Sequence, residues 1–496
     1  MRVLVAARGE AAVRVARAAR ELGWEPVTIH TRDDRFSPHV SAGVFSLEVP
    51  SYTDADAIVE AALRAGADVL HPGYGFLSES PEFAEKVLSA GISWAGPPPR
   101  AMRLLGDKWS AKRLAEKVGV PTLPWCEAGG PEEAARCAEK LGGRVVVKAS
   151  RAGGGRGQRV AGSPEEAARV YRLVALEAGS GFGGAGRVYV EKLLERPRHI
   201  EVQVLGDSDG GLLHLYEREC SLQRRRQKVV EEAPSPLASR IRGLRERLVE
   251  YALRLAEAAG YQSAGTVEFL VDPSSGEAFF IEANTRLQVE HGVTEAVTGV
   301  DIVKSQLLVA AGRRLPYRQE EIRLRGWAVE ARIYAEDPWR GFAASEGVVT
   351  RVRLPGGPWV RVDHALSPGL RVNPRYDTML AKVIAYGWDR GEAVERLSAA
   401  LRETVIAGVE TNLDLLRSLV ESSWFREGSY HTRSLEEGLE DLLSVAERRR
   451  RLAALAAGAI RARGPQAAPL GALQGKGPSH GWPGRRWTAA AKAAPG

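Results

Sequence analysis

Two glutamates that flank a predicted β-hairpin turn could together hold a metal ion. The runs VEFLVD and EAFFIE lie on either side of Pro273–Gly276, and β-patterned runs bounded by turn formers are typical of a hairpin. With the turn centred near Ser275, Glu268 faces Glu282 with Cβ atoms about 4.5–5.5 Å apart, where like charges repel. A cation is then needed, and oxygen ligands favour Mg²⁺ or Mn²⁺. Asn284, on the same face, could add a third oxygen. The alternatives are an exposed polar strand face or a slipped register.

The polar alternation continues past this pair. Every second residue is polar, at Glu282, Asn284, Arg286, Gln288 and Glu290. If the segment stays extended, these side chains line one face. A guanidinium suits a planar oxyanion such as carboxylate or bicarbonate. The pattern therefore predicts a metal-held polyphosphate beside an anion-binding arginine and a potential base.

A glycine-rich loop could cradle phosphates. Lys148 ends the apolar run VVVKAS and is followed by RAGGGRGQ, residues 151–158. Glycines let backbone N–H groups approach phosphate oxygens, and the lysine adds a positive charge. The loop lacks the G-x-x-x-x-G-K-[ST] pattern. An ordinary surface loop explains it equally well when it is considered alone, whereas together with the hairpin it indicates a lid over a triphosphate.

The elements that must position these residues follow an α/β rhythm. At the N-terminus, apolar runs and helical periodicity predict strands over 2–6, 26–30 and 68–71 and helices over 9–22 and 54–65. This rhythm implies a parallel sheet with ligands at its carboxyl ends. No G-x-G-x-x-G follows the first strand, so a dinucleotide site there is not expected.

Farther along the chain, the patterns predict a second set of elements. Strands are expected over 145–150, 187–194 and 199–207, a helix over 237–260, short strands within 326–388 and helices within 392–421.

Composition excludes several classes of protein. No apolar run reaches the roughly 18–20 residues of a membrane helix, and the first residues lack a signal-peptide pattern, so we expect a cytoplasmic protein. Three widely spaced cysteines, Cys126, Cys137 and Cys220, exclude a disulfide scaffold and a thiolate zinc site.

The net charge of +7 belongs to the tail. Residues 446–496 hold ten Lys/Arg and one acid, a net +9, so the remaining residues carry −2. The run Arg448–Arg451 is expected to cap or follow a helix end, and the Gly/Pro/Arg-rich remainder to be disordered. Nucleic-acid binding loses most of its support, although Trp482 and Trp487 leave stacking on RNA open as a weak alternative.

Several motifs occur in an order that resembles one enzyme family. These are VAARGEAAVR, HPGYGFLSE, LGDKWSA, KASRAGGGRGQRV, RHIEVQV, ERECSLQRRRQKVVEEAPSP, EFL…IEANTRLQVEH and VEARIYAEDP. Together they resemble biotin carboxylase, an ATP-grasp enzyme, over most of residues 1–440. Departures include Arg226 in a position usually held by histidine, and Arg151-Ala152 within the usual glycine run.

The resemblance implies an α/β fold with α+β elements in four segments. They would be a Rossmann-like N-terminal domain (1–110), an ATP-grasp lid with its linker (111–194), the ATP-grasp core with the C-terminal biotin carboxylase domain (195–445) and a basic tail (446–496).

The resemblance also implies a role for individual residues. Lys108 and Lys148 would contact the ATP phosphates, with Gly154 and Gly155 in the lid. The rest of the nucleotide would meet Glu191, Leu194, His199 and Gln223. Glu268, Glu282 and Asn284 would hold Mg²⁺ (or Mn²⁺). Bicarbonate would meet Lys228, Arg286, Gln288 and Val289, with Glu290 as its general base. Biotin would lie near Tyr74, with its ureido oxygen facing Arg332.

The implied reaction is the ATP- and bicarbonate-dependent carboxylation of biotin through carboxyphosphate. It is the first half-reaction of carboxylases such as acetyl-CoA carboxylase of fatty acid biosynthesis. No A-M-K-M attachment motif is present, so biotin would arrive on a separate biotin carboxyl carrier protein. A homodimer is also implied, together with a separate carboxyltransferase subunit. Three alternatives remain open: another ATP-grasp carboxylate or carbamate ligase, a degraded scaffold subunit, and a nucleic-acid binder acting through the tail.

Overall fold

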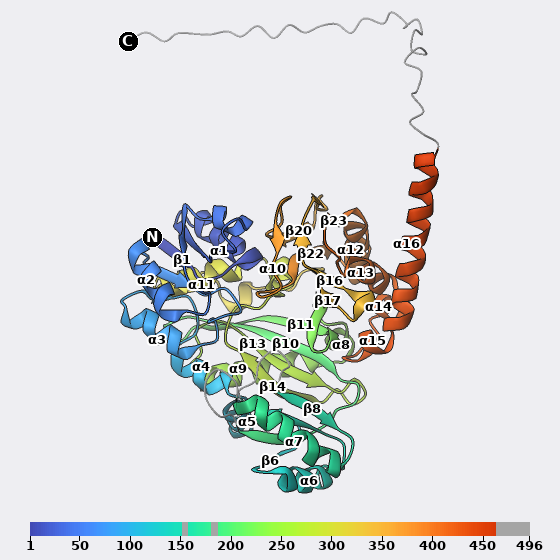
Figure 1. Ribbon diagram of the computed structural model, residues 1–496. Helices are drawn as coiled ribbons and strands as arrows, with labels where there is room; N and C mark the ends of the chain where they lie inside the picture. The colour runs from blue at the N-terminus through green and yellow to red at the C-terminus, as the bar shows by residue number, and fades with distance from the viewer. Residues whose placement is uncertain (151–156, 180–186, 463–496) are drawn as a thin grey trace, which may run out of the picture. The chain divides into compact units, whose positions relative to one another are not determined.

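The computed structural model describes residues 1–150, 157–179 and 187–462 (Figure 1). The chain divides into two units, 1–446 and 447–496. The account below concerns the first unit, except for the helix that enters the second. None of the described helices combines the length and the apolar character that crossing a membrane requires.

The N-terminal region is the predicted parallel α/β layer. Its five strands run in the order β3-β2-β1-β4-β5 and pair in parallel. The strands are β1 (Arg2–Val5), β2 (Glu25–His30), β3 (Phe45–Glu48), β4 (Val69–His71) and β5 (Ser93–Trp94). The helices are α1 (Gly9–Glu21), α2 (Ala55–Ala65) and α3 (Pro81–Ser89). Buried alanines and valines on one side of α1 pack on the sheet. The predicted elements are confirmed to within a residue or two.

Two helices lead into a small four-stranded domain. α4 (Pro99–Gly106) and α5 (Lys108–Lys117) precede a sheet with the order β6-β9-β7-β8. Its strands are β6 (Trp125–Glu127), β7 (Val145–Ala149), β8 (Gln158–Ala161) and β9 (Val188–Lys192), and α6 (Pro131–Lys140) and α7 (Pro164–Gly179) pack beside them. Figure 1 shows both helices against this sheet.

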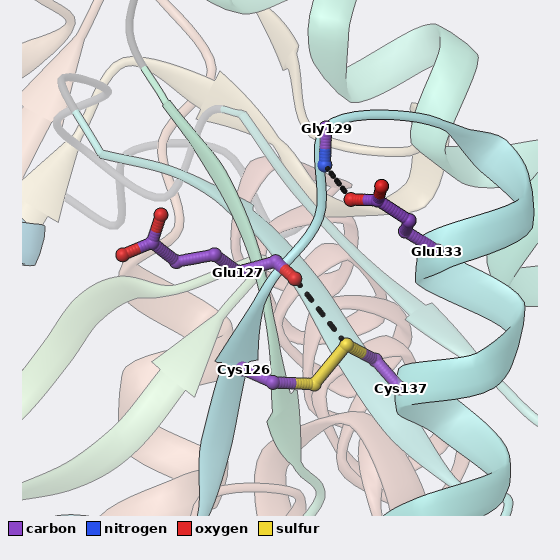
Figure 2. The surroundings of a disulfide bond; sticks show 5 residues. All are labelled: Cys126, Glu127, Gly129, Glu133 and Cys137. Carbon is purple, nitrogen blue, oxygen red and sulfur yellow. Dashed lines mark hydrogen bonds between the residues drawn. A yellow bond between two sulfur atoms is a disulfide. The ribbon is translucent and has the colours of Figure 1, made fainter.

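A disulfide that the sequence analysis did not foresee lies in this small domain. Cys126 on β6 bonds to Cys137 on α6, with their Cα atoms 6.2 Å apart (Figure 2). The bond ties the first strand to the helix that follows it. A single bond is not a disulfide scaffold, but two of the three cysteines do pair, and Cys220 is buried and free.

A large antiparallel sheet forms the centre of the first unit. Its eight strands run in the order β14-β13-β10-β11-β12-β15-β22-β20 within the described residues. They are β10 (Arg198–Gly206), β11 (Leu212–Arg224), β12 (Gln227–Ala233), β13 (Ser263–Val271), β14 (Ala278–Asn284), β15 (Trp327–Tyr334), β20 (Val360–His364) and β22 (Met379–Gly387). β10 is buried along its entire length. The expectation of short strands over 326–388 is therefore wrong for β15 and β22, which span eight and nine residues.

Helices cover this sheet and build its cores. They are α8 (Pro236–Arg240), α9 (Leu244–Ala258), α10 (His291–Thr298), α11 (Ile302–Ala310), α12 (Arg390–Glu403), α13 (Leu413–Glu421), α14 (Ser423–Arg426) and α15 (Ser434–Glu437). α9 packs on β10 and β11, α4 and α5 pack on β14, α12 packs on β15 and β22, and α13 packs on β15. The single helix predicted over 237–260 is broken because Gly243 takes a φ of +77°, a conformation that glycine adopts without steric cost.

Short strand pairs complete the C-terminal region. They are β16 (Glu336–Asp337) with β17 (Ala343–Ala344), β18 (Gly347–Val348) with β21 (Arg371–Val372), and β19 (Arg351–Arg353) with β23 (Val405–Ala407). Helix α16 (Leu439–Ala462) then crosses into the second unit. The run Arg448–Arg451, expected to cap or follow a helix end, lies inside α16 instead. Trp482 and Trp487 lie outside the described residues. The segment boundaries at 110, 194 and 445 stay a prediction.

Candidate active site

The acidic hairpin forms with the predicted register. β13 pairs with β14 so that Glu268 faces Glu282, and a bulge follows Glu268. In this structure each acid is balanced by a lysine. Lys228 Nζ lies 2.9 Å from Glu268 Oε1, and Lys108 pairs with Glu282. The amide of Asn284 donates to Glu268 Oε1 over 2.8 Å. The facing acids therefore need cations, as the sequence indicated.

The segment after Asn284 is not extended, so the predicted one-faced alternation to Glu290 is wrong. β14 ends at Asn284 and the chain turns into α10 with Glu290 at its N-cap. Arg286 and Gln288, two residues of the predicted polar alternation, still lie beside the hairpin. Arg286 Nη1 donates to Gln288 Oε1 over 2.9 Å and Nη2 to Asn284 Oδ1 over 3.3 Å. The guanidinium also lies 3.2 Å from Glu79. The turn thus keeps Arg286 beside the acidic pair.

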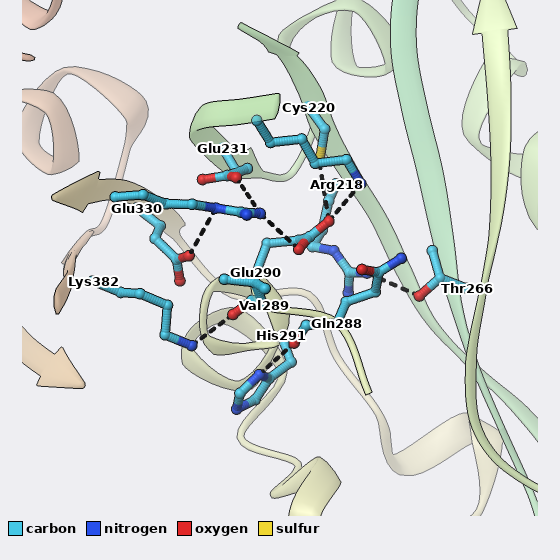
Figure 3. Close-up of polar contacts among 12 residues, drawn as sticks. Arg218, Cys220, Glu231, Thr266, Gln288, Val289, Glu290, His291, Glu330 and Lys382 are labelled. Atoms are coloured by element: carbon cyan, nitrogen blue, oxygen red, sulfur yellow. Dashed lines mark hydrogen bonds and ion pairs between the residues drawn. The ribbon is translucent and has the colours of Figure 1, made fainter. Parts of the chain in front are cut away.

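Glu290 is fully buried and contacts two cations. Its Oε1 accepts from Lys228 Nζ over 2.5 Å, and its Oε2 accepts from Arg332 Nη2 over 2.8 Å. Figure 3 shows its carboxylate facing Arg218 and Cys220 of β11, with Glu231 nearby. Burial alone raises the pKa of Glu290, but Lys228 and Arg332 outweigh burial and hold this pKa well below its ordinary value. Glu290 is therefore ionised at neutral pH, as a base must be.

Lys228 on β12 joins the hairpin to Glu290. Its ammonium group lies 2.5 Å from Glu201, 2.9 Å from Glu268 and 2.5 Å from Glu290. Burial lowers the pKa of Lys228, but the three carboxylates raise it far more, so its net pKa is well above the ordinary value. One buried cation thus serves three acids.

Arg332 on β15 lies between two acids. Its Nη2 is 2.5 Å from Glu231 and 2.8 Å from Glu290. Its Nη1 lies 3.4 Å from the hydroxyl of Tyr334. The side chain is 6 % exposed, so little of the guanidinium reaches solvent. Arg332 therefore depends on this cluster for its position.

The predicted phosphate lysines come from two elements. Asp107 caps α5 by accepting from the Ser110 N–H over 2.8 Å, which places Lys108 in the first turn. Burial and the nearby Lys148 lower the pKa of Lys108 to about 8. Lys148 on β7 pairs with Glu191 on β9, which also pairs with the buried Lys112. Glu191, which was predicted to contact the nucleotide, therefore forms ion pairs with two lysines in this structure.

The remaining predicted nucleotide and biotin residues vary in their surroundings. His199 Nε2 lies 3.0 Å from Glu268 Oε2, and its Nδ1 lies 2.9 Å from the amide of Gln223. Leu194 follows β9 and is half-buried. The buried hydroxyl of Tyr74 finds no hydrogen-bond partner among the described residues. Gly154 and Gly155 lie outside them.

Several buried polar residues were missed by the sequence analysis. Glu201 and Arg218 face each other on β10 and β11, and Arg218 Nε lies 2.6 Å from Glu201 Oε1. Lys382 on β22 donates to the Val289 carbonyl over 2.6 Å, as Figure 3 shows. The sequence did contain a sign of Glu201 and Arg218, because the motifs RHIEVQV and ERECSLQ place charged residues inside strand-like runs. Lys382 had no such motif around it.

Matches to known families cover most of the chain. Residues 1–102 match "Biotin carboxylase, N-terminal domain", 107–318 match "Carbamoyl-phosphate synthase L chain, ATP binding domain", and 330–437 match "Biotin carboxylase C-terminal domain". The chain belongs to the biotin carboxylase family.

Relatives and solved structures agree with this membership. A biotin carboxylase from Nostoc sp. is 42 % identical, covering 88 % of this chain and 98 % of the relative. A pyruvate carboxylase subunit from Methanothermobacter thermautotrophicus is 44 % identical, covering 88 % and 89 %. The biotin carboxylase domain dimer of Hydrogenobacter thermophilus 2-oxoglutarate carboxylase, with MgADP, ADP and bicarbonate, has a TM-score of 0.86 and 44 % identity, covering 89 % and 98 %.

The enzyme class follows from this membership. The protein is an ATP-grasp ligase that uses ATP, Mg²⁺ and bicarbonate to carboxylate biotin. The donor set fits the metal, because the two carboxylates and the amide on β13 and β14 offer only oxygen ligands. The relatives differ in the acceptor that their names give, so family membership leaves the acceptor of the carboxyl group open.

Proposed function

We propose that the buried cluster around Glu290 carries out the first half-reaction of a biotin-dependent carboxylase. The observation that carries this proposal is the position of one ionised glutamate against two buried cations, beside an acidic hairpin suited to Mg²⁺. In this proposal Glu268, Glu282 and Asn284 hold the metal, which neutralises charge on the triphosphate. Lys108 and Lys148 contact the phosphates.

Bicarbonate is a poor electrophile, so ATP must activate it. In our proposal Arg286, Gln288 and the backbone of Val289 orient bicarbonate, with Lys228 balancing its charge. Glu290 takes the bicarbonate proton while the bicarbonate oxygen attacks the γ-phosphorus. The bond from that phosphorus to the ADP oxygen breaks, leaving carboxyphosphate and ADP.

The second step moves the carboxyl group to biotin. Carboxyphosphate releases CO₂ and phosphate, and the phosphate takes the proton of the biotin ring nitrogen. That nitrogen then attacks CO₂. Arg332 stabilises the negative charge on the ureido oxygen, since preorganised cations act where charge develops. Tyr74 lies near the ring in this proposal, while His199, Gln223, Glu191 and Leu194 position the nucleotide.

We further propose that biotin arrives on a carrier protein and that a carboxyltransferase consumes the product. A homodimer is supported by the dimeric H. thermophilus domain. A cytoplasmic location is part of the same proposal.

The test is an ADP-release assay with and without bicarbonate and free biotin. We expect release that requires bicarbonate and rises with biotin. Release without bicarbonate, or release indifferent to biotin, would favour another ATP-grasp ligase. ATP binding without any turnover would favour a scaffold subunit.

A further inference from the structure

A cavity of about 800 Å³ lies between the loop after β2 and the segment that follows β21. Its lining includes four arginines: Arg32 and Arg35 from the loop, Arg371 at the start of β21, and Arg375 beyond that strand. All four are exposed. We call this surface the arginine groove. Its lining consists of residues 31–37, Pro50, Val348, residues 369–371, Arg375 and Tyr376.

The four arginines have no charge partner in the part of the chain that the structure describes. Among residues 1–150, 157–179 and 187–462, none of their guanidinium groups makes an ion pair or a hydrogen bond, and that of Arg35 stacks on Phe36. A single exposed arginine without a partner costs little stability, because water solvates its charge. Four arginines around one groove produce a positive field that favours the binding of an anion.

The lining holds two acids against four arginines, and neither acid forms an ion pair with any of the four. Asp34 is buried and pairs with Arg8 over 2.7 Å. Asp33 accepts from the Tyr376 hydroxyl over 2.7 Å and from the Asn373 amide over 2.8 Å. Asp33 therefore joins the loop after β2 to the segment after β21, whereas Asp34 is paired within the N-terminal region.

The groove adjoins the Arg332 end of the candidate active site. The Tyr376 ring packs edge-on against the ring of Phe76, with the two ring centroids 6.3 Å apart. Phe76 lies two residues after Tyr74 in the sequence. Three residues beyond Tyr376, Met379 pairs with Tyr334 on β15, the strand that carries Arg332. The groove is therefore linked to the strand of Arg332 through the segment that carries Tyr376 and Met379.

The remaining lining favours a protein over a small anion. The Phe36 side chain is 80 % exposed and Val348 is 39 % exposed, and Tyr376 forms part of the wall. Arginine and aromatic residues together are enriched at protein interfaces. A site for a free phosphate needs no exposed apolar surface.

We propose that the arginine groove docks an acidic surface next to the biotinyl-lysine of the carrier. This inference rests on the proposed function, because it supposes that biotin is the substrate. The charge attraction speeds encounter and orients the carrier, whereas free biotin reacts without using the groove.

The test compares three peptides of equal length in which biotinyl-lysine is flanked by glutamates, glutamines or lysines. We expect kcat/KM at low salt to be about tenfold higher for the acidic than for the neutral peptide, within the range of electrostatic steering. The basic peptide should be the poorest substrate. The preference should shrink as added salt shortens the screening length.

Two variants probe opposite walls of the groove. The double variant Arg371→Glu/Arg375→Glu should abolish or reverse the peptide preference, and Arg32→Gln/Arg35→Gln should weaken it. The matched control Arg313→Glu changes an exposed arginine outside the lining and should leave the preference intact. Anisotropy of a labelled acidic peptide provides a readout independent of turnover.

Free biotin separates the two proposals. If the wild type carboxylates free biotin, and the variants keep that activity and their KM for ATP while losing the peptide preference, the groove is the carrier site. Equal rates for all three peptides would overturn this inference alone. So would loss of free-biotin turnover in the groove variants, or displacement of the acidic peptide by millimolar inorganic phosphate. Absence of free-biotin turnover in the wild type would instead count against the proposed function.

Discussion

Replacing Glu290 with glutamine tests the assigned base most directly. Glutamine keeps the shape of the side chain but cannot accept a proton at neutral pH. A positioned general base contributes about 10²–10⁴-fold to rate, which corresponds to about 3–5 kcal/mol of barrier. We expect Glu290→Gln to lower bicarbonate-dependent ADP release at least about 100-fold.

The substitution also carries a structural cost that must be separated from the chemical one. Oε1 and Oε2 of Glu290 accept from Lys228 and Arg332 respectively, so the new amide nitrogen must face one of these donors. A buried donor left unsatisfied costs about 1–3 kcal/mol of stability. Folded fraction and ATP binding must therefore be measured with the rate.

Glu231→Gln is the matched control. Glu231 is equally buried and lies 2.5 Å from the same Arg332, but burial raises its pKa to about 7 despite that arginine. Because Glu231 is partly protonated at neutral pH, an amide resembles it. We expect the rate of ADP release by Glu231→Gln to stay within about tenfold of the wild-type rate, which corresponds to about 1.4 kcal/mol in the activation barrier. Two results would refute the assignment of the base: a folded Glu290→Gln enzyme with near-wild-type ADP release, or equal losses in both variants.

Three further predictions concern the buried charges and the metal. Lys382→Met should lower the free energy of unfolding in urea by about 3–5 kcal/mol, because it leaves buried acids without their cation. The control Lys304→Met removes a partly exposed ion pair with Glu21 and should cost about 1 kcal/mol or less. Equal costs in the two variants would contradict the reasoning. Burial raises the pKa of Glu10 from 4.5 to about 7, so its contribution to stability is complete below pH 4.5 and is lost as pH rises through 7. Glu10→Gln should therefore match the wild type near pH 4 and exceed it by up to about 3 kcal/mol at pH 8 in urea unfolding; the same difference at both pH values would refute this. Glu282→Gln should raise the Mg²⁺ concentration for half-maximal ADP release at least about tenfold, whereas Glu277→Gln at the exposed turn should not, and an unchanged Mg²⁺ requirement in both would remove Glu282 from the metal site.

The sequence predicted the hairpin well because its information is local. Turn formers fix where the chain reverses, and reversal fixes which residues face each other, so Glu268 and Glu282 pair as expected. The N-terminal parallel sheet was equally accessible, since buried strands and amphipathic helices alternate there. Neither feature depends on a distant part of the chain.

The sequence pattern did not reveal where β14 ends and α10 begins, and the reason is physical. α10 is buried on nearly all sides, so it lacks the polar face that marks a surface helix. Its N-cap residue is Glu290, which does not cap through its side chain, whereas typical caps are Ser, Thr, Asp or Asn. Period-two polarity therefore continued past the real boundary. The side chains still gather because the turn brings Gln288 back to Glu268, at 3.4 Å.

The buried acids around Glu290 show how one carboxylate is kept ionised while the pKa values of two neighbouring acids are raised. Lys228 and Arg332 both contact Glu290, and its pKa falls. Glu231 forms an ion pair with Arg332 and is only distantly affected by Lys228. Glu330 lies 4.0 Å from the Arg332 guanidinium and is also affected by Lys382. For both acids burial outweighs these cations, so the pKa of each is raised. Acids whose pKa values are pushed apart can take different roles at one pH. The cluster therefore keeps a negative charge on Glu290, the residue proposed to receive the bicarbonate proton, and raises the pKa values of Glu231 and Glu330. This distribution depends on which strands are neighbours, and no pattern within a single segment could have revealed it.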